Sequence, residues 1–333
     1  MTGSAPGAPS RVVIVGASAA GLAVAETLRG SGHTGTVTLV GEELRAPYDR
    51  PPLSKEILSG AWTADRLALR ASADLDSLGL ETRYGVTAVG LDTGARTVAL
   101  SDGTEAAYDG LVIATGVRPR RLPGPPLTSC APWTTRWPSR TASAPAALVV
   151  AGFLGAEAAA VAAAPGTRAT LLEPAAVPLA HAVGNDVGRV LAEAHLHHGV
   201  DLRIGTKAGE VVPDGVRLDD GTVIEADTVL VAIGSRPNTE WLADSGLPLH
   251  DRLVCDEFSA AAPGVYGAGD VVRWHNPGFG VSMRIEHRTN ATEQGMAAAR
   301  NLLGAGHPFA PVPYFWSPGH GLDTEAYAVV VAV

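Results

Sequence analysis

Two glycine-rich turns, each between an apolar run and a helix-forming stretch, constrain the fold of this chain more than any other feature. The first lies in R-V-V-I-V-G-A-S-A-A-G-L-A, residues 11–23. Gly16 permits a tight turn after a buried strand, and Gly21 lets the following helix pack closely on that strand. Ser18 replaces the usual middle glycine, and its small side chain still lets a pyrophosphate approach backbone N–H groups at the helix N-terminus. The stretch predicts a dinucleotide-binding βα unit, with an ordinary glycine turn as the alternative. Its candidate contacts are Gly16, Ala17, Ser18, Ala19 and Gly21.

A carboxylate follows this turn near the spacing expected of a dinucleotide fold. The next apolar run, residues 37–40, ends at Gly41-Glu42-Glu43. An acidic residue about 20 residues beyond the glycines reaches a ribose hydroxyl in such folds. We therefore expect Glu42 to contact the ribose of the first dinucleotide.

A second, altered signature reads L-V-V-A-G-F-L-G-A-E, residues 148–157. Gly152 and Gly155 keep two glycine positions, whereas Val150 stands at the first, where the turn often needs a backbone angle that a β-branched residue resists. Sixteen residues beyond Glu157, a predicted strand ends at Glu173. A carboxylate there accepts hydrogen bonds from a ribose and repels a 2′-phosphate, which favours NADH over NADPH; a surface acid is the alternative. A chain with two dinucleotide sites suggests a flavoprotein that is reduced by a nicotinamide.

The stretch between the first unit and residue 60 carries a family resemblance. Residues 45–56 read R-A-P-Y-D-R-P-P-L-S-K-E, which is too proline-rich for a regular strand. With G-A-S-A-A-G before it, this string resembles the FAD-dependent ferredoxin reductases of oxygenase electron chains, relatives of putidaredoxin and rubredoxin reductases. The resemblance implies that Arg50 contacts FAD and that Lys55 lies at the flavin ring, where an ammonium stabilises negative charge on the reduced flavin. A solvated turn with a surface lysine is the alternative.

Three later segments resemble the parts of that family that close the flavin site. Residues 108–116, 229–234 and 264–270 are apolar runs that end in small residues, and the last ends in a carboxylate. The resemblance implies that the first segment returns the chain beside the FAD, that the second returns it from the nicotinamide domain, and that Asp270 contacts a ribityl hydroxyl. The candidate residues are Ala114, Thr115, Gly116, Gly234, Gly269 and Asp270.

The segment at residues 284–303 resembles the loop and helix that cross the pyrimidine edge of the flavin. The family tripeptide is normally Glu-His-Trp, and here it is Glu286, His287 and Arg288. An arginine there would stabilise charge on the flavin but removes an aromatic packing surface, so the direction of the effect is open. We expect His287 to act by packing and hydrogen bonding rather than as a catalytic acid. The resemblance also sets Glu157 beside the nicotinamide and the flavin lysine, which predicts an ion pair between Lys55 and Glu157.

Two stretches depart from the family pattern. Residues 127–141 fit no periodicity, and read one base out of frame they give the helix that the family has; we interpret them as a local frameshift, real or artefactual. Residues 312–317, V-P-Y-F-W-S, resemble the entry to a third domain, of which 317–333 would be a remnant. Trp316 lies near the flavin or is an exposed remnant. The apolar tail, A-V-V-V-A-V, is an aggregation risk if no strand pairs with it.

Composition limits the partners and the chemistry. A net charge of −9 argues against nucleic acid and anionic membranes. Docking of an acidic ferredoxin would need a basic patch such as Arg118, Arg120 and Arg121, and Arg120 is also a candidate for cofactor contact. The two cysteines, Cys130 and Cys255, lie too far apart in sequence for a dithiol relay. The sequence contains no Cys/His cluster that could hold a metal or iron–sulfur centre, so the one-electron carrier would be a separate protein.

These observations predict a doubly wound α/β protein with two Rossmann-like domains. An FAD domain at residues 1–119 and 247–316 would be split around an NAD domain at 120–246. The predicted function is hydride transfer from NADH to FAD, then single-electron transfer to a [2Fe–2S] ferredoxin that feeds a haem monooxygenase or a dioxygenase. An NADH oxidase or diaphorase and a non-catalytic flavin-binding protein are the alternatives. An N-terminus without a basic start and apolar core predicts no signal peptide and a cytosolic protein.

Overall fold

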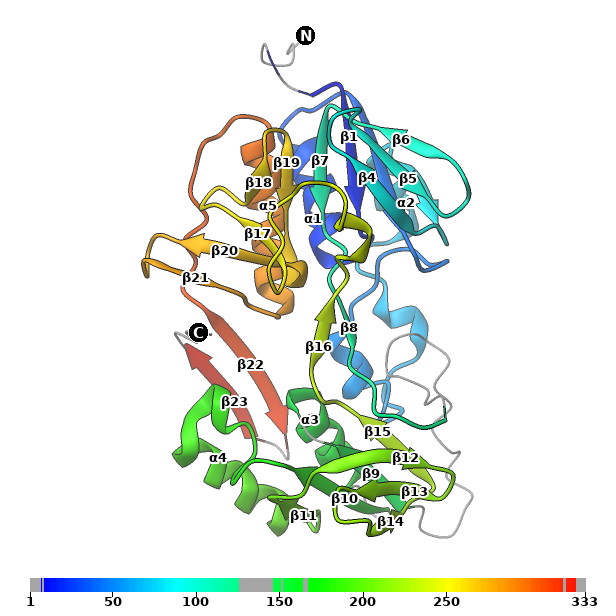
Figure 1. Cartoon of the computed structure of the whole chain (residues 1–333), viewed down its shortest axis with the longest axis vertical. Helices are drawn as coiled ribbons and strands as arrows, with labels where there is room; N and C mark the ends of the chain where they lie inside the picture. Colours follow the sequence, from blue (N-terminus) through cyan, green and yellow to red (C-terminus); the bar gives the residue numbers. More distant parts are fainter. Residues whose placement is uncertain are drawn as a thin grey trace.

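The computed structural model of the chain describes residues 7, 9–125, 146–150, 152–163, 167–319 and 322–327. Within these residues the chain forms two main, largely parallel β-sheets with helices packed on them, one in the upper and one in the lower half of Figure 1. The segment at 127–141, interpreted as a frameshift, and the apolar tail at 328–333 lie outside the described residues.

The first sheet has six strands in the order β18-β19-β7-β1-β2-β3, and every neighbouring pair except β18–β19 is parallel. Both faces of the central strand β1 are buried, because Val12 and Ile14 pack on one side and Val13 and Val15 on the other. A strand buried on both faces reads as a continuous apolar run, which is what the sequence has. The strands are β1 (Arg11–Val15), β2 (Thr36–Gly41), β3 (Glu81–Tyr84), β7 (Gly110–Ile113), β18 (Ala260–Ala262) and β19 (Val265–Gly267).

Helices α1 (Ala19–Gly30) and α5 (Arg288–Leu302) pack against each other on one face of the first sheet. Their contact is close at Gly295, where a Cβ atom would lie 2.5 Å from the Ala20 carbonyl oxygen. A larger residue at 295 would therefore push α5 away from α1.

Smaller elements cover the other face of the first sheet and its rim. Two three-stranded sheets, β4-β5-β6 and β17-β20-β21, contribute to the same hydrophobic core as Val13 and Val15. Their strands are β4 (Ala88–Asp92), β5 (Thr97–Leu100), β6 (Glu105–Ala107), β17 (Leu253–Cys255), β20 (Val272–Asn276) and β21 (Val281–Met283). The short helices are α2 (Ser72–Ser77), η1 (Pro51–Ser54), η2 (Ala64–Leu67), η3 (Glu240–Leu242) and η4 (Gly269–Val271).

The second sheet has four parallel strands in the order β11-β10-β9-β15. Helix α3 packs against its strands β9 and β10, and α4 packs against β11, while a three-stranded antiparallel sheet, β12-β13-β14, shares a second core with it. The elements are β9 (Ala146–Val150), α3 (Phe153–Ala162), β10 (Arg168–Glu173), α4 (Ala180–His197), β11 (Asp201–Ile204), β12 (Ala208–Val212), β13 (Gly215–Leu218), β14 (Val223–Glu225) and β15 (Thr228–Val231).

Two antiparallel strands connect the two halves of the molecule. β8 (Val117–Pro119) leaves the first sheet and β16 (Ser235–Pro237) returns to it, and the two run side by side between the sheets in Figure 1. β22 (Tyr314–Gly319) and β23 (Leu322–Tyr327) form a hairpin that contacts α3. Trp316 lies in β22 opposite Glu325, and its relation to a flavin stays a prediction.

Candidate functional site

The first glycine turn is shaped by two backbone contacts that exclude side chains. Gly16 has a φ of 121°, and a Cβ atom there would lie 2.0 Å from the Ala114 carbonyl oxygen. A Cβ atom on Gly21 would lie 1.8 Å from the Gly16 carbonyl oxygen. Ser18 is the N-cap residue of α1, and its side chain makes no capping hydrogen bond. The first turn of α1 therefore keeps backbone N–H groups available to an anionic ligand, as the sequence predicts.

The carboxylate predicted to hold a ribityl hydroxyl lies where the two packed helices begin. Gly269 approaches the first turns of both, since a Cβ atom there would lie 3.3 Å from the side chains of Ala20 and Ala291. Asp270 follows it and is partly exposed; its carboxylate accepts no hydrogen bond from the described residues. Burial and the nearby Glu286 carboxylate raise the pKa of Asp270 to about 7. A carboxylate that accepts no hydrogen bond from the described residues fits a ligand that supplies hydroxyl donors.

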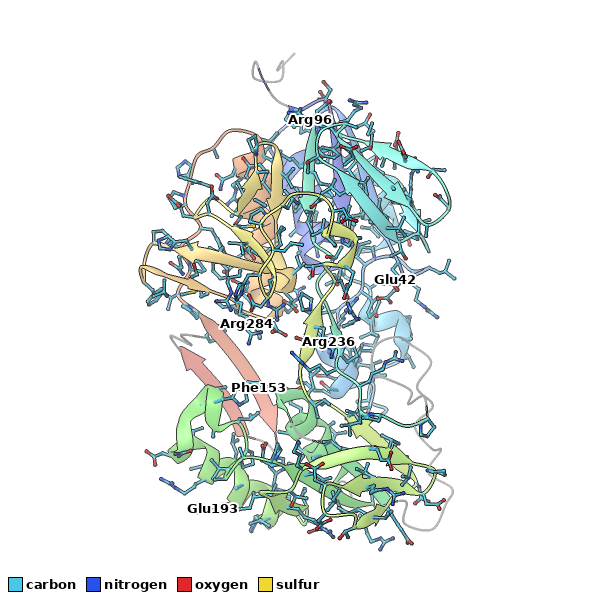
Figure 2. All side chains as sticks on the ribbon, viewed as in Figure 1. Glu42, Arg96, Phe153, Glu193, Arg236 and Arg284 are labelled. Carbon is cyan, nitrogen blue, oxygen red and sulfur yellow. The ribbon has the colours of Figure 1, made fainter. Side chains whose placement is uncertain are left out.

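In the 45–56 segment, the cation Arg50 lies near the end of the first sheet at which β2 ends. Arg50 donates a hydrogen bond to Glu43 at 2.8 Å, and its guanidinium lies 5.8 Å from the centre of the Tyr48 ring. Burial raises the pKa of Tyr48 to about 12. Glu42 is exposed and is labelled in Figure 2 below the first sheet, near the end of β2. Arg50 is thus fixed by neighbours, and Glu42 is open to a ligand.

The predicted ion pair between Lys55 and Glu157 is present. Lys55 Nζ donates to Glu157 Oε2 at 2.8 Å, and the side chains are 18% and 7% exposed. Ser54 Oγ donates to the same oxygen at 2.9 Å. Lys55 follows η1, in the segment after β2, whereas Glu157 lies in α3 on the second sheet, so the pair joins the two predicted nucleotide sites. The alternative of a surface lysine is wrong.

The residues at the start of α5 are tied to the 45–56 segment. Arg288 Nε donates to Asp49 Oδ1 at 2.9 Å, so part of its charge is neutralised by protein. His287 is the N-cap of α5, and its Nδ1 accepts a hydrogen bond from the Thr289 N–H at 3.3 Å. Burial, followed by the Lys55 charge, lowers the pKa of His287. This geometry agrees with a hydrogen-bonding and packing role for His287.

The second glycine turn differs from the expected strained one. Val150 is the last residue of β9, is 3% exposed, and pairs with Leu172 and Val231 in the sheet. It has no positive φ, so the backbone strain expected at this position is absent. Gly152 takes the close approach instead, because a Cβ atom there would lie 2.1 Å from the Ala232 carbonyl oxygen. A valine is thus compatible with the turn.

The acidic residue predicted to select NADH is buried rather than on the surface. Glu173 ends β10, is 7% exposed, and its Oε1 accepts a hydrogen bond from the Ala175 N–H at 2.9 Å. Gly155 is buried in α3, near the start of that helix. The alternative of a surface acid at Glu173 is wrong. Its second carboxylate oxygen, Oε2, accepts no hydrogen bond from the described residues.

The family follows from a comparison over most of the chain. A family model described as pyridine nucleotide-disulphide oxidoreductase matches residues 10–295. The chain belongs to this family. The doubly wound α/β fold predicted from the two glycine turns is therefore confirmed.

Three similar proteins are reductases by their names. Rhodocoxin reductase of Rhodococcus erythropolis is 36% identical over 320 residues, which cover 92% of this chain and 75% of that protein. The ferredoxin–NAD(+) reductase component of the p-cumate 2,3-dioxygenase system of Pseudomonas putida is 36% identical over 319 residues, covering 92% and 78%. The putidaredoxin reductase in its covalent complex with putidaredoxin has a TM-score of 0.83 and 30% identity, covering 95% of this chain and 80% of that one. The resemblance to ferredoxin reductases is confirmed.

Despite the family's name, the cysteine that the structure describes is not placed for disulphide chemistry. Cys255 is 5% exposed, and burial raises the pKa of its thiol. A buried thiol of this kind is a poor nucleophile. Cys130 lies outside the described residues.

The connection between the sheets brings several predicted residues together. Thr115 Oγ1 donates to the Asn238 carbonyl at 2.9 Å, and Asn238 Nδ2 donates to the Thr115 carbonyl at 2.9 Å. The Arg120 N–H donates to the Gly234 carbonyl at 2.9 Å. These bonds hold the departing and returning strands as one unit. Arg118 pairs with Glu240, which weakens the basic patch predicted for partner docking.

Sequence reasoning missed one charged residue of this site, Arg252. Its side chain is 1% exposed and donates to Glu286 Oε1 at 2.5 Å. The local sequence, H-D-R-L before β17, is typical of a polar turn and carries no signal of burial. The burial of this turn next to the site can be seen only in the tertiary structure.

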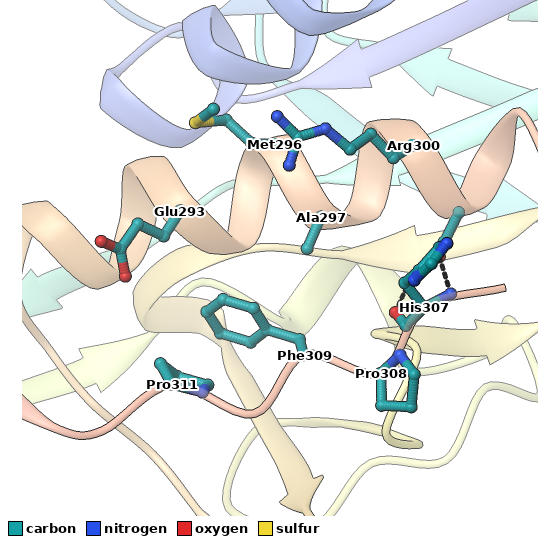
Figure 3. Close-up of a pocket in the computed structure, with 9 residues that line it drawn as sticks. Glu293, Met296, Ala297, Arg300, His307, Pro308, Phe309 and Pro311 are labelled. Atoms are coloured by element: carbon teal, nitrogen blue, oxygen red, sulfur yellow. Dashed lines mark hydrogen bonds between the residues drawn. The ribbon is translucent and has the colours of Figure 1, made fainter. Parts of the chain in front are cut away.

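A separate cavity of 340 Å³ is lined by α5 and by the segment at 307–311 (Figure 3). Met296, Ala297 and Phe309 give it apolar walls, and Arg300 and Glu293 are at its sides. None of the residues predicted to contact a nucleotide lines it. We therefore do not assign it to a cofactor. Among the residues that the structure describes, no helix is both long enough and apolar enough to cross a membrane.

Proposed function

We propose that this chain is an NADH-dependent, FAD-containing ferredoxin reductase. It would accept hydride from NADH on FAD and pass single electrons to a [2Fe–2S] ferredoxin of a cytosolic oxygenase system. The FAD domain would comprise residues 1–119 and 247–316, and the NAD domain residues 120–246. One relative named above is, by its name, the ferredoxin–NAD(+) reductase component of a dioxygenase system, and another is in a covalent complex with putidaredoxin.

The observation that carries this proposal is the buried ion pair between Lys55 and Glu157. It joins the segment that follows the first glycine turn to the helix that follows the second. Hydride transfer needs the two cofactors in contact and water excluded, and a pair of this kind fixes the relative position of their sites. An ordinary surface contact between two domains would not need a buried lysine.

The first site suits FAD because its parts match the chemistry of that molecule. The glycine turn and the N-terminus of α1 would hold the diphosphate, Glu42 a ribose hydroxyl, and Asp270 a ribityl hydroxyl. Lys55 would supply a cation to the flavin ring, and Arg50 would supply a second cation to the FAD site. FAD, when bound, supplies the change from two-electron to one-electron transfer.

The second site suits NADH because of its carboxylate. Gly152 and α3 would receive the diphosphate, and Glu173 would accept hydrogen bonds from the ribose of the adenosine and repel a 2′-phosphate. Val150, paired inside its strand, leaves this turn intact and weighs against a non-catalytic flavin-binding protein. Lys55, Glu157 and His287 would orient the nicotinamide and exclude water, and none of them is asked to transfer a proton.

Anaerobic titration with NADH tests this proposal. FAD-reconstituted protein should lose its visible flavin absorbance at about one equivalent of NADH, and at least ten times more NADPH should be needed for the same initial rate. Glu157→Gln should slow this reduction, whereas Glu193→Gln, an exposed acid on α4 (Figure 2), should not. Bound flavin that NADH does not reduce would contradict the proposal.

Electron output is tested separately with two acceptors. Reduction of a [2Fe–2S] ferredoxin by NADH supports the full proposal. Turnover with ferricyanide but none with any of several [2Fe–2S] ferredoxins would favour the NADH oxidase or diaphorase. One observation favours this second candidate: Arg118 is paired with Glu240, which weakens the basic patch predicted to dock a ferredoxin.

A further inference from the structure

Arg252 is a buried cation to which the function above gives no role. It precedes β17, and its side chain is 1% exposed. Taking a guanidinium out of water is costly unless it is paired and hydrogen-bonded. Its neighbours should therefore show what it stabilises.

The guanidinium joins segments that are far apart in sequence. One terminal nitrogen donates to the Asp270 carbonyl oxygen, and the other donates to Glu286 Oε1 at 2.5 Å. Glu286 Oε2 also accepts from Ser235 Oγ at 2.5 Å, and Arg284 lies 3.5 Å from Oε1. Arg252 thus ties η4 to the loop before α5, and Glu286 extends the tie to the strand that returns from the second sheet.

Charges of both signs act on Asp270. Burial and Glu286 raise the pKa of Asp270, while Arg252 and Arg50 lower it, with the result of about 7. Arg252 in turn faces Glu286, Arg284, Asp270 and Asp251. Without Arg252, Asp270 would face Glu286 with only Arg50 as a cation and would take up a proton more readily.

We propose that Arg252 is a positioning residue of the flavin site, which holds the Asp270 backbone in place and favours the ionised form of its carboxyl group. This inference rests on the proposed role of Asp270 in binding the ribityl chain. A carboxylate accepts a stronger hydrogen bond from a hydroxyl than a carboxylic acid does. Arg252 therefore extends to lower pH the range over which the chain binds FAD tightly.

FAD binding to the apoprotein as a function of pH tests this inference without any turnover. The dissociation constant, from quenching of flavin fluorescence between about pH 5.5 and pH 9, should rise for the unchanged protein as the pH falls through about 7. In Arg252→Met the midpoint should move up by about one pH unit, and affinity at pH 7 should fall about fivefold. Arg252→Lys should restore most of the midpoint. Glu286→Gln should move it down, because the carboxylate that disfavours ionised Asp270 is gone.

Arg273→Met is the matched control. Arg273 lies in β20 and pairs with Asp251, the residue next to Arg252, at 2.7 Å. Its loss should lower stability without moving the pH midpoint of FAD binding, because it is not among the charges that act on Asp270.

Three outcomes would overturn the inference. One is an Arg252→Met protein that melts cooperatively and binds FAD with the unchanged midpoint. If that variant does not fold, an unchanged midpoint in Glu286→Gln decides against it. The third is an unchanged chain that binds FAD with no pH dependence near 7. An apoprotein that binds no FAD at any pH refutes the proposed function itself, which distinguishes the two failures.

Discussion

The interaction between Lys55 and Glu157 can be isolated by a double-mutant cycle on the free energy of unfolding. Lys55→Met, Glu157→Gln and the double variant, compared with the unchanged chain, give a coupling energy that removes the separate effects of each substitution. Lys55→Met alone should be the most damaging, because it removes the Lys55 ammonium from the buried Glu157 carboxylate.

The expected magnitude follows from distance and burial. Two unit charges 2.8 Å apart attract by about 6 kcal/mol at an effective dielectric constant of about 20. Desolvation of side chains that are 18% and 7% exposed offsets a large part of this attraction. We expect a coupling energy of about 2–3 kcal/mol.

Urea unfolding followed by far-UV circular dichroism measures this coupling. The control is the pair Arg217 and Glu210, whose charged atoms are 2.7 Å apart but whose side chains are 47% and 43% exposed. Its coupling energy should be below about 1 kcal/mol. If the two cycles give the same value, burial does not strengthen the Lys55–Glu157 pair, and the argument that it fixes the two nucleotide sites fails.

Three further predictions concern single residues. Gly16→Ala should abolish FAD binding and lower the free energy of unfolding by about 3 kcal/mol, because its Cβ would meet a carbonyl oxygen at 2.0 Å. Gly60→Ala is the control: its φ is 76° and nothing lies within 4 Å of the added Cβ, so the free energy of unfolding should fall by only about 1 kcal/mol. Equal losses in the two variants would refute this prediction. Burial, with Arg29 nearby, lowers the pKa of His33, whose ring nitrogens have no hydrogen-bond partner among the described residues. The unfolded chain then binds a proton below about pH 6.5 that the folded chain resists, so urea midpoints should fall from pH 7.5 to pH 5.5 and His33→Leu should flatten this slope; a parallel fall in the variant would exclude His33 as the cause. Glu173→Ala should raise the ratio of kcat/KM for NADPH over NADH about tenfold in stopped-flow reduction, and an unchanged ratio would show that Glu173 does not select the cofactor.

Local sequence was sufficient wherever a backbone contact allows only one kind of residue. The turn at Gly16 and the carboxylate at Glu173 could be predicted from spacing, because a strand, a glycine turn and a helix follow one another within a few residues, whereas Asp270 was predicted from family resemblance. The same reasoning overestimated the damage at Val150. A pattern of glycines does not reveal which of them makes the close approach, and here it is Gly152.

Pairings between distant segments were less accessible. The partner of Lys55 was predicted from family resemblance, since nothing local links it to a residue 102 positions away. The pairing of Arg288 with Asp49, 239 positions apart, was not predicted. The Asp49 carboxylate neutralises part of the Arg288 charge that was expected to act on the flavin.

The sequence by itself determined the two dinucleotide units, because each is a short-range arrangement of strand, turn and helix whose residues are neighbours in the chain. The tertiary structure alone decided the charge balance around Asp270. Burial and proximity of Arg252, Glu286 and Asp270 arise only when the chain returns from the second sheet and packs beneath the first. Desolvation and Coulomb interactions depend on distance in space, and spacing along the chain does not fix that distance.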